Sequence, residues 1–383
     1  MFHESLALRT PGPTPLPPSV QLAAARPAIY HRGPTFEGLY RRCAEGLQRI
    51  FGTAHEVLLL TASSTGAMEA AVAASVWPGA KATVLVGGKF GERWAELCTA
   101  YGCMAEVLPY PVGEGARPES LDAHLAAHPG TEVVFATYNE SSTAVCNDVA
   151  ALAETAHRHG ALIVVDAVSI AGGAPLEMDA WGLDVVVAGS QKCLMIPPGL
   201  GFIALNERAW ARAAGSPSPR YYLDPVRHKK AAMKGQTPYT PNTQLIVQLA
   251  AALDLIESEG LPAVFARHRL LRAMVRAGGA ALGCPPFVDE RWASPTLTAF
   301  LPPDGVRVPA LTAALRERFG VEIVGGQGEL AATIFRIGHM GYVTPADMIV
   351  ALAALEHGLA AQGHAVRWGA GLSAAQEVWA KWA

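Results

Sequence analysis

Cysteine is scarce in this chain and never occurs as a closely spaced pair. The six cysteines are scattered, with no CxxC spacing: Cys43, Cys98, Cys103, Cys146, Cys193 and Cys284. Close CxxC pairs are typical of structural zinc sites, and dense cysteine frameworks are typical of small secreted domains. The pattern therefore predicts reduced thiols in a cytoplasmic protein and no structural zinc site.

Three common motifs of catalytic sites are also missing. The sequence contains no GxGxxG, no GxxxxGK[ST] and no HExxH. These motifs usually indicate a hydride-transferring enzyme, a nucleoside-triphosphate enzyme and a zinc protease, so their absence argues against these three classes. His157 and His159 stand close together at a charged helix end, and we expect both to be solvated rather than to bind a metal.

Neither an excess of charge nor a long apolar run is present. The 30 Lys and Arg residues face 33 Asp and Glu residues, which gives a formal net charge of −3 and argues against nucleic acid or an anionic membrane surface as a partner. Apolar runs such as ALIVV are far too short to span a bilayer. The N-terminus has no basic stretch followed by an apolar one, so we expect no signal peptide.

What is present is an alternation of short apolar strands with helical stretches from about residue 56 onward. The runs EVLLLT, TVLVGG, EVVFAT, ALIVVDAV, LDVVVAG and GFIAL alternate with helix-like segments such as TGAMEAAVAASV and GERWAELCTAYG. Continuously apolar strands that alternate with helices predict an α/β fold whose parallel sheet is covered on both faces.

A second region with a different pattern begins near residue 241. We expect long helices over about 242–258 and up to about 282, then strands at LTAFLP, VEIV and IFRIG, a helix that ends at Arg318 and a helix over 345–360. This order predicts a smaller α+β domain. The resulting division is an N-terminal arm (1–20), a large domain (21–260) and a small C-terminal domain (261–383). The proline-rich arm is expected to lie extended on a subunit surface, and the tail from 364 to be a surface segment.

Polar residues follow two of the predicted strands where those strands end. Asp166 ends VVD, and Gln191 with Lys192 follows VVVAGS. In an open parallel sheet, ligands bind at the carboxyl ends of the strands, so we expect these side chains to meet in one crevice. Taken singly, the aspartate could be a helix N-cap and the lysine a surface residue.

Together these residues suit pyridoxal phosphate. A lysine amine forms a Schiff base with its aldehyde, and a carboxylate keeps its pyridine nitrogen protonated. The hydroxyl-rich loop Ser63-Ser64-Thr65-Gly66 lies between a strand and a helix, where backbone N–H groups at a helix N-terminus bind phosphate. A plain N-cap would explain one hydroxyl but not the cluster.

Several motifs in this order resemble one protein family. TASSTGAMEAA, FGERW, YNESSTAV, VVDAVSIAGGAPLEMD, GSQKCLMIPPGLGFI, QTPYTPNTQLI and FRIGHMG are similar to those of class V, fold type I pyridoxal-phosphate aminotransferases of the alanine–glyoxylate and serine–glyoxylate type. The resemblance covers nearly the whole chain. It implies a large domain with a mostly parallel seven-stranded sheet flanked by helices, and a smaller α+β domain.

The resemblance also implies residue roles around the cofactor. Lys192 would bind it covalently and move the substrate proton, and Asp166 would pair with the pyridine nitrogen. The remaining implied contacts are Ser63, Ser64, Thr65 and Gln191 at the phosphate, Phe90 stacked on the ring, Val168 behind it and Ser141 at its hydroxyl side. Phe90 could instead be plain core, and Ser141 could cap a turn.

For the substrate, the resemblance implies that Arg336 binds the carboxylate as a bidentate fork. Thr240 would reach the phosphate of a neighbouring subunit, which makes the expected unit a homodimer. Because Arg336 is the one basic residue clearly assigned to the substrate, we expect small monocarboxylates. The expected donor is serine or alanine and the expected acceptor is glyoxylate or pyruvate, in a ping-pong reaction. Other arginines could line the cleft, namely Arg32, Arg220 or Arg227.

Rival functions remain open at this point. Pyridoxamine–pyruvate and 2-aminoethylphosphonate–pyruvate transaminases share most of these motifs. A lyase or cysteine desulfurase on the same fold would need a nucleophilic thiol, for which Cys284 is the candidate in the second domain. A non-catalytic assembly subunit would be expected to lose the lysine or the aspartate.

Overall fold

Seven strands form the central sheet of the computed structural model, which describes residues 6–382. Their spatial order is β2-β10-β9-β8-β5-β3-β4, and β10 alone among them runs antiparallel to its neighbours. The strands are β2 (Val57–Leu60), β3 (Lys81–Val86), β4 (Met104–Pro109), β5 (Val133–Thr137), β8 (Leu162–Asp166), β9 (Val185–Gly189) and β10 (Gly201–Leu205). The mostly parallel seven-stranded sheet is confirmed.

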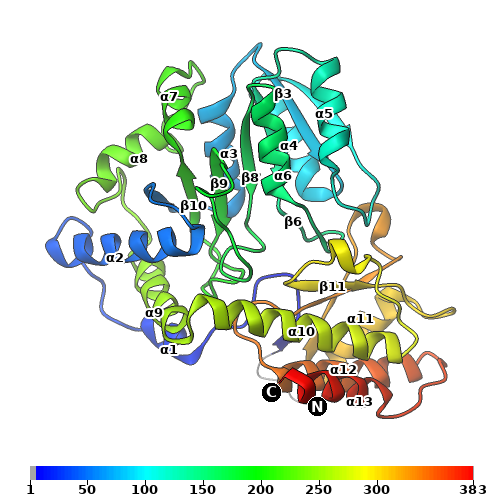
Figure 1. Cartoon of the computed structure of the whole chain (residues 1–383). Coiled ribbons are helices and arrows are strands. Elements are labelled where there is room, and N and C mark those ends of the chain that lie inside the picture. The colour runs from blue at the N-terminus through cyan, green and yellow to red at the C-terminus, as the bar shows by residue number, and fades with distance from the viewer. Residues whose placement is uncertain (1–5, 383) are drawn as a thin grey trace.

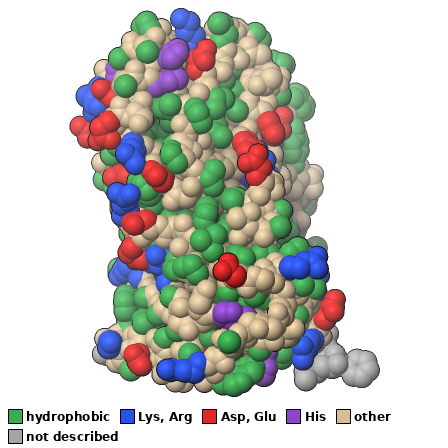
Figure 2. Space-filling model, turned by 90° about the vertical axis from the view of Figure 1, so that its right-hand side faces the viewer, with side chains coloured by type: hydrophobic (Ala, Val, Ile, Leu, Met, Phe, Trp, Pro, Cys, Tyr) green, Lys and Arg blue, Asp and Glu red, His purple; other side chains and the backbone are tan. Residues whose placement is uncertain are grey.

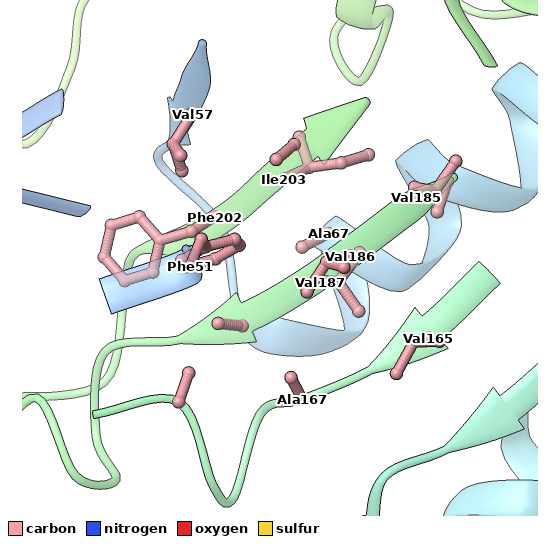
Figure 3. Packing of buried hydrophobic residues seen from close by; sticks show 14 of the residues in the cluster. Phe51, Val57, Ala67, Val165, Ala167, Val185, Val186, Val187, Phe202 and Ile203 are labelled. Atoms are coloured by element: carbon pink, nitrogen blue, oxygen red, sulfur yellow. The ribbon is translucent and has the colours of Figure 1, made fainter. Parts of the chain in front are cut away.

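Helices lie on both faces of this sheet (Figure 1). The helices of this region are α1 (Pro18–Ala23), α2 (Pro34–Phe51), α3 (Ser64–Ser75), α4 (Lys89–Ala100), α5 (Pro118–Ala127), α6 (Val149–Arg158), α7 (Glu207–Gly215), α8 (Pro225–Ala232) and α9 (Thr243–Glu259). Among them, α1 packs against α9 rather than on the sheet. Every residue of β5, β8, β9 and β10 is buried, as expected for strands covered on both faces. Figure 3 shows part of this core, where Phe51 of α2 and Ala67 of α3 belong to one cluster with side chains of β8, β9 and β10.

The C-terminal region has its own sheet and hydrophobic cluster. Its antiparallel sheet has the order β11-β14-β13. The elements are α10 (Leu261–Ala281), η1 (Glu290–Trp292), β11 (Leu297–Phe300), α11 (Val308–Phe319), β12 (Val321–Glu322), β13 (Val324–Gly325), η2 (Gly328–Leu330), β14 (Phe335–Gly338), α12 (Pro345–Ala360) and α13 (Ala370–Trp382). Helix α10 joins the two regions, because Val264 belongs to the large cluster and Leu271 to the second. The exact domain boundaries stay a prediction.

The tail differs from the expected surface segment. Residues Ala370–Trp382 form helix α13, which packs against α10 and α12. Ala375 on its inner side is fully buried, whereas Trp379 and Trp382 are exposed. The small residues of the tail therefore make the contact, and its tryptophans are exposed to solvent.

The N-terminal arm also differs from the expected surface position. Residues 1–5 of the predicted arm lie outside the described residues, but β1 (Ala7–Leu8) pairs in parallel with β12. Arg9 is buried and forms an ion pair with Asp347 at the start of α12. The predicted strand VEIV is split, since β12 pairs with the arm and β13 with β14. The arm is therefore built into the fold as far as Pro18, which begins α1.

The surface agrees with the balanced composition. Figure 2 shows Lys and Arg side chains interspersed with Asp and Glu on one face, without a large field of either sign. Within residues 6–382, no helix combines the length and the apolar character needed to cross a membrane.

Two helical glycines form a matched pair that tests how tightly α10 packs. A Cβ at Gly279 would lie 2.3 Å from Cε1 of Phe300 on β11, whereas a Cβ at Gly38 of α2 meets nothing within 4 Å. We expect Gly279→Ala to lower the free energy of unfolding by about 1–3 kcal/mol through overpacking. We expect Gly38→Ala to raise it by about 0.5–1 kcal/mol, because alanine is the better helix former. Urea denaturation of both variants measures the effects, and similar losses in both would contradict the prediction.

Candidate active site

The carboxyl ends of the parallel strands meet at one edge of the central sheet, and the predicted site residues follow these ends. Asp166 is the last residue of β8, and Lys192 comes three residues after β9. Ser63 follows β2 as the N-cap of α3, and Phe90 follows β3 in the first turn of α4. Ser141 comes after β5 and directly after the short strand β6 (Asn139–Glu140). This edge is where open α/β sheets bind ligands.

At this edge of the sheet, Lys192 and Asp166 each have a shifted pKa, and the charge of each acts on the pKa of the other. Burial lowers the pKa of the Lys192 amine to about 8, while the charge of Asp166 acts to raise it. Burial also raises the pKa of Asp166 to about 6, opposed by the hydrogen bond that the Val168 amide donates to its Oδ1 at 2.7 Å. The site thus holds a lysine that is easy to deprotonate beside a carboxylate that stays ionised near neutral pH.

The hydroxyl-rich loop is open for an anion. Ser63 caps α3 by its backbone position, and its side chain makes no capping hydrogen bond. The Gln191 amide lies 3.3 Å from the Ser64 hydroxyl, and Arg93 donates to the Thr65 hydroxyl at 3.4 Å. A Cβ at Gly189 would lie 1.9 Å from the Ser64 hydroxyl. Glycine at the end of β9 therefore lets this loop approach the crevice.

Glu140 organises the opposite wall and was missed by the sequence analysis. It forms part of a hairpin of β6 (Asn139–Glu140) and β7 (Val145–Cys146) and has no exposed surface. The Phe90 and Gly91 amides donate to its Oε2 at 3.0 and 3.1 Å. Burial raises the pKa of Glu140, and these hydrogen bonds and those from Ser142 act against that rise. An acidic residue directly after a buried strand, in NESST, was the available signal.

Arg336 lies in β14 and reaches this same wall. It donates to the Ser141 carbonyl at 2.6 Å through Nη1 and to the Gly325 carbonyl at 2.9 Å through Nε. Burial lowers the pKa of Arg336 to about 10, and the charge of Glu140 acts to raise it. These contacts explain how a charge fits an apolar strand, and no acceptor for its Nη2 is found among residues 6–382.

Arg93 is a second missed residue. Its guanidinium lies 4.9 Å from the centre of the Phe90 ring, and within the described residues it pairs with no carboxylate. Phe90 itself is only partly buried, so it borders the crevice rather than filling the core. The arginine of FGERW, one turn after Phe90, was the signal for a cation near the hydroxyl loop.

The arm supplies a third missed contribution. The Lys192 ammonium donates to the Pro11 carbonyl, and the Thr14 hydroxyl donates to the Lys192 carbonyl at 2.9 Å. A Cβ at Gly12 would lie 2.5 Å from Cδ of Lys192. The glycine between two prolines in TPGPTP therefore marks a close approach of backbone to the lysine.

Other candidates stay apart from this cluster. Thr240 is exposed and makes no side-chain hydrogen bond within the part of the chain that the structure describes. Cys284 is buried in the C-terminal cluster, where burial raises the pKa of its thiol to about 12. His157 and His159 bond to different carboxylates, those of Asp184 and Asp122. No group of three or more His, Cys, Asp or Glu suited to a metal ion occurs in residues 6–382.

A partly buried lysine near a buried carboxylate and an open helix N-terminus, at the edge of a mostly parallel sheet, is typical of the fold type I transferases. The sequence matches the family Aminotransferase class-V over residues 20–340. This chain therefore belongs to the class V aminotransferases and is a transaminase.

Individual relatives agree over almost the whole chain. A soluble hydrogenase small subunit of Synechococcus is 40% identical over 98% of this chain and 99% of its own. The serine–glyoxylate aminotransferase of Hyphomicrobium methylovorum is 35% identical over 97% and 94%. The crystal structure of pyridoxamine–pyruvate aminotransferase from Mesorhizobium loti superimposes with a TM-score of 0.95 at 32% identity, over all of both chains.

The shifted pKa of Lys192 predicts a specific pH response. In the cofactor-free protein, we expect the rate of Lys192 acetylation by trace acetic anhydride to reach half its maximum near pH 8. Asp166→Asn should move this midpoint lower, because the carboxylate raises the lysine pKa. Since the unfolded lysine titrates near 10.4, the folded protein releases this proton first, and its contribution to stability grows as pH rises from about 8 to 10. Peptide mass spectrometry measures the labelling, and a midpoint above 10 would contradict the assignment.

Alanine substitutions at Gly12 and Gly79 distinguish the effect of backbone strain from the effect of contact with Lys192. Both have positive φ, +104° and +86°, but a Cβ at Gly79 meets nothing within 4 Å. We expect each alanine variant to lose about 1–3 kcal/mol of unfolding free energy through strain. Gly12→Ala should in addition displace the arm from Lys192 and lower kcat at least tenfold, whereas Gly79→Ala leaves kcat unchanged. Equal kcat in the two folded variants would show that the arm does not matter to the lysine.

Proposed function

We propose that the cofactor of this transaminase is pyridoxal 5'-phosphate, held covalently by Lys192. The observation that carries the proposal is the partly buried Lys192 together with the buried Asp166 at one edge of the sheet, each with a shifted pKa. The cradle fits the group, because the Ser63 side chain and the start of α3 are free, Gly189 leaves room beside Ser64, and Arg93 adds a positive charge. When bound, this cofactor acts as an electron sink for the reacting amino acid.

We infer the remaining contacts from the resemblance to the family, and the positions of these residues around the crevice support them. Asp166, ionised above about pH 6, would pair with the pyridine nitrogen. Ser63, Ser64, Thr65 and Gln191 would bind the phosphate at the N-terminus of α3. Phe90 would lie on one side of the ring and Val168 on the other, with the hydroxyl of Ser141 at its edge.

The residues of this chain also supply the proton transfer and the substrate anchor. A lysine whose pKa is about 8 is partly neutral at physiological pH and is suited to take a proton from the substrate carbon and return it. The Pro11 carbonyl would orient the amine, and the arm would exclude water from that side. Arg336, whose Nη2 has no acceptor among the described residues, would bind the substrate carboxylate.

The substrates we propose are a small amino acid, serine or alanine, and a small 2-oxo acid, glyoxylate or pyruvate, in a ping-pong reaction. The relatives named for serine, glyoxylate and pyruvate support this class. The other arginines considered are engaged elsewhere: Arg32 with Gln236 and Thr237, and Arg220 and Arg227 with Asp224. Arg93 is assigned to the phosphate side, so Arg336 is the one arginine assigned to the substrate, and this favours monocarboxylates. The pyridoxamine–pyruvate and aminoethylphosphonate reactions, and a lyase or desulfurase reaction, are the alternatives.

We further propose a cytoplasmic homodimer in which Thr240 contributes to the phosphate site of the partner subunit. The exposure of Thr240 and its lack of a side-chain partner within residues 6–382 support this placement. A second candidate is a non-catalytic assembly subunit, which the relative named as a hydrogenase subunit brings into consideration. The presence of both Lys192 and Asp166 favours the enzyme.

An amino-donor panel tests the proposal. We expect serine or alanine to convert the bound cofactor to its pyridoxamine form, followed by absorbance, and glyoxylate or pyruvate to convert it back. Lys192→Ala should lower the conversion rate about 10²-fold or more, as for loss of a general acid–base group, while Lys81→Ala, at an exposed strand start, should not change it. Normal turnover by Lys192→Ala would refute the proposed catalytic role. Reaction with pyridoxamine or aminoethylphosphonate alone would correct the substrate class.

A further inference from the structure

A cavity of about 370 Å³ lies between the two regions of the chain, apart from the lysine site. Its lining comes from the start of α6, the turn after β8, the first half of α10 and η1. None of the residues assigned above to the cofactor or the substrate lines it. The turn after β8 separates the two sites: Val168 bonds to Asp166, while Ala174 and Pro175 face this cavity.

One face of α10 makes the cavity cationic. Phe265, Arg269 and Arg272 all line it, and their spacing of four and three residues places them on one side of a helix. Arg291 of η1 lines it as well. Three arginines thus face one space that is large enough for a small molecule.

Two acidic residues also line the cavity, and one of them is already paired with arginines. Glu290 is shared by Arg272 and by Arg276, whose Nε lies 2.8 Å from Oε2. Asp148 caps α6 by accepting from the Ala151 amide at 3.0 Å. Within residues 6–382, Arg269 has neither an ion pair nor a hydrogen bond. One guanidinium therefore remains for an anion from outside.

The other walls of the cavity are aromatic. Tyr138 and Trp181 meet edge to face, with ring centres 5.8 Å apart, and the Tyr138 hydroxyl donates to the Pro175 carbonyl at 2.9 Å. Phe265 adds a third ring. Cys146 also lines the cavity, and burial raises the pKa of its thiol to about 12, so it brings no negative charge. Rigid rings next to a free guanidinium suit a ligand with one aromatic ring and one carboxylate.

We propose that this cavity binds a small aromatic carboxylate, with the ring against Tyr138, Trp181 and Phe265 and the carboxylate on Arg269. The ligand would touch α10 on one side and the turn after β8 on the other, so it would hold the two regions of the chain together. Since it would bind the folded protein, it would also raise the melting temperature.

Calorimetric titration of the cofactor-loaded protein with 3-phenylpropionate tests the proposal. We expect one site per chain and a rise in Tm on binding. Arg269→Ala should weaken binding about tenfold or more, the effect of losing a charge-assisted hydrogen bond. The neutral analogue 3-phenylpropionamide should bind the unaltered protein more weakly by a similar factor. Arg318→Ala removes an exposed arginine of α11 outside the cavity and should leave the affinity unchanged.

The compound 3-phenylpropionate could also bind at the lysine site, through Arg336. The variant Arg336→Gln therefore distinguishes binding at the lysine site from binding in this cavity. Binding that survives Arg336→Gln and is lost in Arg269→Ala supports the proposal. Binding lost in Arg336→Gln, or unchanged in Arg269→Ala, would overturn it. Transamination is measured on the same samples, so a failure of the cavity site is distinguished from a failure of the proposed catalytic function.

Discussion

The buried carboxylate of Glu140 is the interaction on which the rest of the site depends. A charge with no exposed surface is costly unless hydrogen bonds and opposite charges surround it. Glu140 meets this demand with the amides of Phe90 and Gly91, with both donors of Ser142 and with the charge of Arg336. The same contacts fix the start of α4, the turn that carries Ser141 and the approach of β14. One carboxylate thereby positions the ring neighbour and the substrate arginine proposed above.

The arm completes the site from the other side. It joins the C-terminal region through β1 and β12 and through the ion pair of Arg9 with Asp347. Five residues later, the Thr14 hydroxyl donates to the backbone carbonyl of Lys192, in the segment that follows β9 of the large sheet. The crevice is therefore closed by a segment anchored in both regions, and the lysine lies between the end of β9 and the Pro11 carbonyl. A movement of the two regions relative to each other would also move this carbonyl.

Local patterns predicted the parts of the molecule that depend on local chemistry. Apolar runs gave the buried strands, and the polar residues after them placed Asp166 and Lys192 at one edge, because strand ends in a parallel sheet meet there. The contacts of Glu140, Arg93 and the arm were missed because they join residues far apart in the sequence; Pro11 and Lys192 are separated by 181 positions. The strand partners of a segment also determine where its strands begin and end. The segment VEIV forms two strands, β12 and β13, because each pairs with a different neighbour. The roles of all the proposed cofactor and substrate residues remain predictions.

The balance of charge inside the crevice connects these features to ligand binding. Three basic groups, on Lys192, Arg93 and Arg336, face two acidic groups, on Asp166 and Glu140, and the N-terminus of α3 adds a further positive end. Burial disfavours the charged forms of the basic groups. It therefore lowers the pKa of Lys192 to about 8 and that of Arg336 to about 10. A phosphate beside α3 and a carboxylate beside Arg336 would each reduce the repulsion among these cations. A chain with a net charge of only −3 can therefore attract two anions locally, because the attraction comes from a few desolvated groups and a helix end rather than from the surface as a whole.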